Sequence, residues 1–118
     1  MTVKIYHNPR CSKSRATLSF LERQGVTPEI IAYLDTPPTS EELASILIML
    51  GLGPRDIMRR KEAPYKELGL SDENLSDDAL ILAMVNHPIL IERPIVVNDD
   101  KAVLGRPPEK ILEILDVS

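Results

Sequence analysis

The chain has 118 residues, of which 43% are hydrophobic and 27% charged, and its formal net charge at pH 7 is −4. These values are typical of a single soluble globular domain, expected here over residues 1–118, and they exclude a disordered chain. The negative charge gives no general attraction to nucleic acid or to anionic membranes. No apolar run approaches the roughly 20 residues that a membrane-spanning helix needs. We therefore expect neither a nucleic-acid partner nor a membrane partner.

The first part of the chain has a strand–helix–strand pattern. Residues 3–6 form a short apolar run that predicts a strand, and the Asn8-Pro9 step predicts a turn. Helical spacing follows over residues 12–24, and a β-prone run over residues 29–34 predicts a second strand. Two strands joined through a helix in this way are expected to be parallel.

The middle of the chain is predicted to be helical. Thr39 and Glu42 have the spacing of a capping box before an apolar helix over residues 43–50, which is expected to be buried on most sides. A short helical piece is predicted over residues 54–60, and an irregular polar stretch follows it. A further helix, over residues 76–86, begins with a serine cap and an acidic first turn.

The last part of the chain returns to strands. Residues 94–97 and 102–104 predict two antiparallel strands, followed by an amphipathic helix. That helix is expected to turn four apolar side chains inward: Ile111, Leu112, Ile114 and Leu115. The element order predicts an α/β protein with a thioredoxin-like fold, in which helices flank a mixed four-stranded sheet and a helical insertion follows the second strand. Such folds often have a cis-proline before the third strand, and Pro94 is the candidate.

Cys11 is the only cysteine, and it lies in the turn between the first strand and the first helix. Backbone N–H groups and the dipole at a helix N-terminus favour a thiolate over a thiol. Lys13 and Arg15 add positive charge nearby, and His7 precedes the cysteine by four residues. A lone cysteine argues against a secreted disulfide scaffold and favours the reducing cytoplasm. Any redox cycle at Cys11 must take its second thiol from another molecule.

The chain resembles the arsenate reductases that couple to glutathione and glutaredoxin, in particular the short arsenate-reductase-like subgroup. The resemblance extends over nearly the whole chain and rests on several collinear motifs. These motifs are residues 5–9, Cys11, Ser14-Arg15, 33–34, 36–38, 65–70, 87–91, 93–97 and Arg106-Pro107.

The resemblance implies a reaction and a set of site residues. It implies that Cys11 attacks arsenate as a thiolate and that His7 lies near that thiolate. It implies a group of oxyanion-binding residues: Arg59, Arg93, Arg106, Ser14 and Arg15. The residue types suit the chemistry, because the planar arginine fork binds an oxyanion bidentately and never loses its charge. Glutathione would be a co-substrate and glutaredoxin a partner, with no bound cofactor and no metal.

Other interpretations remain open. Regulators of the same fold bind RNA polymerase, although they usually carry a Cys-x-x-Cys switch, and Ser14 occupies the second position here. A monothiol glutathione-dependent reductase with another substrate is also possible. A tyrosine-phosphatase loop requires an arginine at the position of Thr17, and that interpretation fails. One cysteine and two distant histidines lack metal-ligand spacing. Arg59 is adjacent to Arg60, so either side chain could face the anion.

Overall fold

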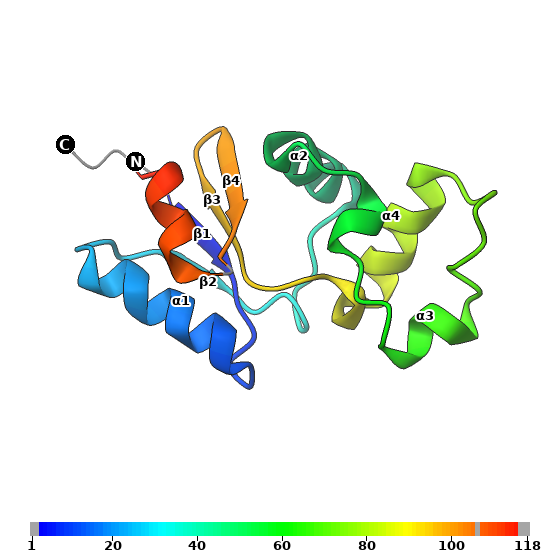
Figure 1. The fold of residues 1–118 in the computed structure, drawn as a ribbon, viewed down its shortest axis with the longest axis horizontal. Helices are drawn as coiled ribbons and strands as arrows, with labels where there is room; N and C mark the ends of the chain where they lie inside the picture. The colour runs from blue at the N-terminus through cyan, green and yellow to red at the C-terminus, as the bar shows by residue number, and fades with distance from the viewer. Residues whose placement is uncertain (1–2, 106, 116–118) are drawn as a thin grey trace. The chain divides into compact units, whose positions relative to one another are not determined.

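The computed structural model describes residues 3–105 and 107–115. The chain divides into two compact units (Figure 1). The sheet unit comprises Met1–Thr36 and Arg93–Ser118, and the helical unit comprises Pro37–Glu92. The helical unit follows the second strand, where the insertion was predicted. The single domain expected from the chain length stays a prediction, and each unit is described by itself.

The sheet unit is built on a mixed four-stranded sheet in the order β2-β1-β3-β4. Its strands are β1 (Val3–Tyr6), β2 (Glu29–Ile31), β3 (Ile95–Asn98) and β4 (Lys101–Leu104). β1 is parallel to β2 and antiparallel to β3, and β3 is antiparallel to β4. The α/β class, the mixed sheet and the parallel opening pair are therefore confirmed.

β2 is shorter than predicted and ends at Ile31. The backbone N–H groups of Asp35 and Thr36 both donate to the carbonyl of Ala32, at 2.9 and 2.8 Å, so the chain turns where an extended strand was expected. β2 is also an edge strand, on which Ile30 remains 53% exposed. Its apolar sequence alone did not reveal that position in the sheet.

Two helices cover one face of the sheet: α1 (Ser12–Arg23) and the 3₁₀ helix η3 (Pro108–Glu113) (Figure 1). The side chains between these helices and the sheet form the core, because alternate residues of β1 and of β3 point to the covered face. This core comprises Val3, Ile5, Leu21, Val96, Ile111, Ile114 and Leu115.

The last helix differs from the prediction in two respects. It is a 3₁₀ helix, in which residues three positions apart lie on the same side. Ile111 and Ile114 are therefore buried together, whereas Leu112 is 43% exposed, and its predicted inward orientation is wrong.

The helical unit begins with α2 (Ser40–Leu50), and the predicted capping box is present. The Glu42 N–H donates to Thr39 Oγ1 at 3.1 Å, and the Thr39 N–H donates to Glu42 Oε1 at 3.2 Å. α2 is not buried on most sides as expected, because Ile48 is 82% exposed. Only one stripe of the helix is fully covered.

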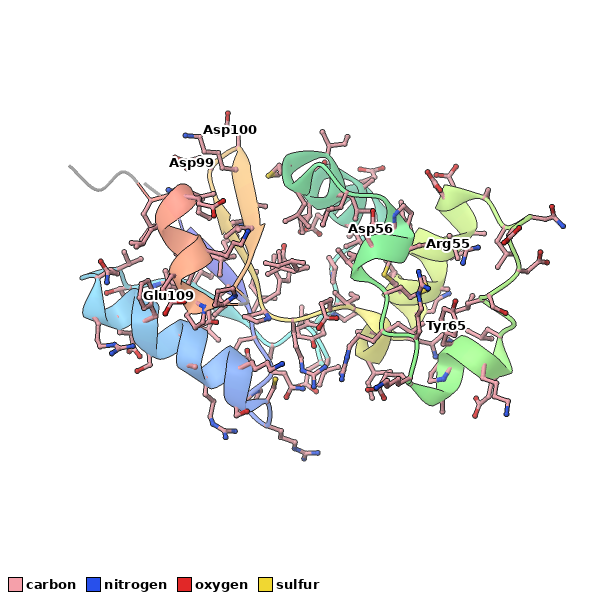
Figure 2. All side chains as sticks on the ribbon, in the orientation of Figure 1. Arg55, Asp56, Tyr65, Asp99, Asp100 and Glu109 are labelled. Atoms are coloured by element: carbon pink, nitrogen blue, oxygen red, sulfur yellow. The ribbon has the colours of Figure 1, made fainter. Side chains whose placement is uncertain are left out.

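The remaining elements of the helical unit are short and are joined by irregular backbone. They are η1 (Pro54–Ile57), α3 (Ala63–Glu67), α4 (Asp77–Asn86) and η2 (Pro88–Leu90). Figure 2 shows Arg55 on η1, whose guanidinium donates to the carbonyls of Leu70 and Asp72 and so anchors the loop that follows α3. α4 begins at the predicted Ser76 cap, which accepts the Ala79 N–H. Across residues 3–105 and 107–115, no helix is long and apolar enough to span a membrane.

Candidate active site

Cys11 lies at the N-cap of α1 with extended backbone torsions, φ −95° and ψ 121°. Its N–H donates to the Asn8 carbonyl, and its own carbonyl accepts the N–H of Arg15, both at 3.0 Å. These two bonds hold the turn after β1 and join it to the first turn of α1. The thiol is a free, partly exposed group at a helix N-terminus.

The surroundings of Cys11 lower the pKa of its thiol below the ordinary value. Burial is the largest single effect and acts in the opposite direction, because it disfavours the charged form. It is outweighed by hydrogen bonds from the Ser14 backbone, the Arg93 side chain and the Lys13 backbone, together with the positive charge of Arg93. The site therefore favours a thiolate, which is the nucleophilic form of cysteine.

His7 and Ser14 form a buried pair behind the thiol turn. His7 Nδ1 lies 2.6 Å from Ser14 Oγ, and the Asn8 N–H donates to the same hydroxyl at 3.0 Å. Burial, and then the positive charge of Arg15, lowers the pKa of His7, which favours the neutral imidazole. The Ser14 side chain is fully buried, so its hydroxyl supports the turn while its backbone faces the thiol.

Two of the predicted arginines, Arg15 and Arg93, are described within the sheet unit. Arg15 is exposed, and its Nη1 donates to the Pro9 carbonyl at 2.8 Å, across the turn that leads to Cys11. Arg93 lies two residues before β3, and the peptide bond that joins it to the candidate cis-proline, Pro94, is cis. The sheet unit thus brings His7, Cys11, Ser14, Arg15 and Arg93 to the N-terminal end of α1.

Of the other two predicted arginines, Arg59 is among the described residues. Arg59 belongs to the helical unit, where its Nη1 is 3.1 Å from Glu62 Oε1 and its backbone N–H donates to the Leu90 carbonyl at 2.7 Å. The side chains of Arg59 and Glu62 are each about one-quarter exposed, whereas Arg60 is exposed. Arg106 lies outside the described residues.

The sequence analysis missed the contacts of three residues: Thr17, Gly105 and Glu62. Thr17 is fully buried on α1, and its hydroxyl donates to the carbonyl of Gly105 at 2.8 Å. The signal in the sequence was the position of Thr17, which lies one helical turn from Ser14 and one from Leu21 and therefore on the same, buried face of α1. Glu62 follows Arg59 by three positions, a spacing that favours an ion pair in a helix, and here the pair forms across a turn.

A pocket of about 420 Å³ lies beside the start of α1. It is lined by Lys13, Ala16, Gly105, Pro107 and Pro108. Within the part of the chain that the structure describes, no group of three or more His, Cys, Asp or Glu side chains is placed to hold a metal ion.

Fold and site together define a thioredoxin-like protein with one activated thiol at the N-terminus of its first helix. A model of the ArsC family matches residues 6–114, and the chain belongs to this family. It is 57% identical to the uncharacterised Escherichia coli protein YfgD over 114 residues, which cover 96% of each chain. It is 54% identical to an arsenate reductase of Neisseria meningitidis over 114 residues, 96% of this chain and 97% of the relative. The structure of an arsenate reductase from Vibrio cholerae matches with a TM-score of 0.93 and 59% identity, covering 98% of both chains.

Proposed function

We propose that this protein is an arsenate reductase that works with glutathione and glutaredoxin. The observation that carries the proposal is the activated Cys11 thiol, which receives hydrogen bonds from two backbone groups and from Arg93. The family and the arsenate reductase names of close relatives support the substrate. The single cysteine supports an external thiol, because the chain cannot form a disulfide within itself.

In the first step, the Cys11 thiolate attacks the arsenic atom and forms a sulfur–arsenic bond. One arsenate oxygen leaves as water after taking up protons. Arg93 has the chemistry to bind the remaining oxygens, since its fork donates parallel hydrogen bonds to an oxyanion. Arg59 and Arg106 complete the proposed arginine set, and they offset the negative charge that accumulates as two anions meet. Arg15 and the first turn of α1 are proposed to border the same anion.

In the second step, the thiol of glutathione bonds to the arsenic, and its proton passes to an arsenic-bound oxygen. The two sulfur atoms then join as a disulfide between Cys11 and glutathione while both sulfur–arsenic bonds break, and each sulfur gives up one electron. Pentavalent arsenic takes these two electrons and leaves as trivalent arsenite. Glutaredoxin exchanges its thiol with the mixed disulfide and returns Cys11 to the thiolate. The cycle requires reduced glutathione, which fits a cytoplasmic location.

The test is arsenate-dependent oxidation of NADPH in the presence of glutathione, glutathione reductase and glutaredoxin. Wild-type protein is expected to sustain the reaction, and Cys11→Ser is expected to abolish it without unfolding the chain. Omitting glutaredoxin should stop turnover after the mixed disulfide, which mass spectrometry detects as one glutathione on Cys11.

Two results would overturn the proposal. Turnover that persists in pure Cys11→Ser protein would refute Cys11 as the nucleophile. A folded wild-type protein with a low-pKa thiol but no arsenate turnover would refute arsenate as the substrate. Glutathione-dependent reduction of another disulfide by that same protein would then favour a monothiol reductase.

A further inference from the structure

Thr17 occupies an unusual position for a polar side chain. It lies on α1 six residues after Cys11 and is fully buried. Threonine hydroxyls in helices commonly bond back to the carbonyl four residues earlier, and Thr17 Oγ1 lies 3.0 Å from the Lys13 carbonyl. The same hydroxyl makes a shorter bond, 2.8 Å, to the carbonyl of Gly105 on another segment. It therefore links the helix that presents Cys11 to the end of β4.

Gly105 is the middle of this link and is itself buried. A Cβ atom at position 105 would lie 2.7 Å from Thr17 Cγ2 and 3.1 Å from Pro94 Cγ, so the close approach requires glycine. The Gly105 N–H donates to the Pro94 carbonyl at 3.0 Å. Two hydrogen bonds and close packing thus connect Thr17, Gly105 and Pro94, which we call the Thr17 clasp.

Each end of the Thr17 clasp carries part of the active site. At one end, α1 presents Cys11 together with the backbone groups of Lys13 and Ser14 that bond to the thiol. At the other end, Pro94 follows Arg93, whose side chain bonds to the same thiol. A change in the separation of α1 and β3 therefore changes the distance between the thiol and its arginine.

We propose that Thr17 is a positioning residue, whose hydroxyl holds α1 against Gly105 and Pro94 so that Arg93 stays within hydrogen-bonding reach of Cys11. The inference deepens the proposed function, because the thiol it concerns is the proposed nucleophile. It does not depend on the substrate, because the state of the thiol is measurable without arsenate.

The test compares Thr17→Val with Thr17→Ser. Valine keeps the shape of threonine and removes the hydroxyl, whereas serine keeps the hydroxyl and removes the methyl group. The rate of Cys11 alkylation by iodoacetamide is measured against pH, which gives the pKa of the thiol directly. Thr17→Val is expected to raise that pKa and to lower kcat/KM for arsenate about tenfold. Thr17→Ser is expected to retain the wild-type pKa and a kcat/KM within about threefold of wild type.

A purely structural role for Thr17 predicts a different pattern. Thr17→Val would then lower the free energy of unfolding and leave the pKa of Cys11 unchanged, which would overturn the inference. Gly105→Ala serves as a second variant, since it keeps the hydroxyl but forces Thr17 and Pro94 apart. It is expected to raise the pKa of Cys11 as well, and an unchanged pKa in that folded variant also contradicts the inference.

Wild-type protein provides the deciding measurement if neither variant folds. By NMR, the Thr17 hydroxyl proton is expected to exchange slowly with water and to show a cross-peak to Gly105. Fast exchange without that cross-peak would overturn the inference. A wild type with a low-pKa thiol but no arsenate turnover refutes the proposed function alone. If the wild-type protein reduces arsenate and the Thr17→Val variant keeps the wild-type pKa of Cys11, the positioning role alone is refuted.

Discussion

Replacing Ser14 with alanine tests whether the buried pair with His7 stabilises the turn before α1. The substitution removes the hydroxyl that lies 2.6 Å from His7 Nδ1 and that accepts the Asn8 N–H at 3.0 Å. The backbone of residue 14 keeps its place, so the hydrogen bond that it makes to Cys11 is retained. The expected effect therefore falls on stability.

Its magnitude follows from the two contacts. A typical hydrogen bond contributes about 1 kcal/mol net, and a buried group left without a partner adds about 1–3 kcal/mol. Ser14 is fully buried and His7 is 8% exposed, so water cannot replace the lost hydroxyl easily. Alanine recovers about 0.5 kcal/mol through its higher helix propensity. Together these contributions predict a fall in the free energy of unfolding of about 2.5–4.5 kcal/mol.

Urea denaturation followed by circular dichroism measures this loss, and hydrogen exchange of the β1 and β3 amides assigns it to the sheet unit. Ser19→Ala is the matched control, because Ser19 lies on the same helix but is exposed. The control is expected to stay within about 0.5 kcal/mol of wild type. If Ser14→Ala is as stable as Ser19→Ala, the hydroxyl does not hold the turn and the reasoning is refuted.

Three further predictions concern charge. Arg93→Lys is expected to lower kcat/KM for arsenate at least about tenfold, since a point charge cannot replace a bidentate fork, and unchanged kinetics would remove Arg93 from the anion site. Glu62→Gln frees Arg59 from a competing carboxylate 3.1 Å away. It should lower KM for arsenate about two- to fivefold with kcat nearly constant, and an unaltered KM would argue against Arg59 as an anion ligand. The pKa of His7 is lowered in the folded chain, so the unfolded chain takes up its proton first as pH falls. The free energy of unfolding should therefore decrease below about pH 6.5, more steeply in wild type than in His7→Gln, and equal pH dependence in urea titrations would contradict this.

Local signals predicted much of the fold. The Thr39 capping box, the Ser76 cap and the position of Cys11 at a helix N-terminus all depend on residues within a few positions of each other. Strand pairing also followed from order, because a short helical connection favours parallel neighbours and a tight turn favours antiparallel ones. The hairpin turn is built on Asp99, whose φ is +54°, and Figure 2 shows it beside Asp100.

Features that depend on distant contacts could not be predicted in this way. Thr17 and Gly105 are 88 residues apart, so nothing near either residue indicates their hydrogen bond. The sequence likewise did not indicate whether the helix that begins at Pro108 is an α-helix or a 3₁₀ helix, and this difference decided the exposure of Leu112. In the candidate site, residue chemistry indicated Cys11. The arginine roles came from family resemblance, and all of them stay predictions.

The order of the strands sets a sequence of events during synthesis. β1 is made first, yet it lies inside the sheet, where Val3 pairs with Asn98 and Tyr6 pairs with Ile95. Until the C-terminal part of the chain emerges, β1 has an open hydrogen-bonding edge and an apolar face without its partners. Residues 37–92, by contrast, are continuous in the chain. A chain that stops before β3 would therefore expose the unpaired edge of β1 to other chains. Premature termination of synthesis would then lead to aggregation.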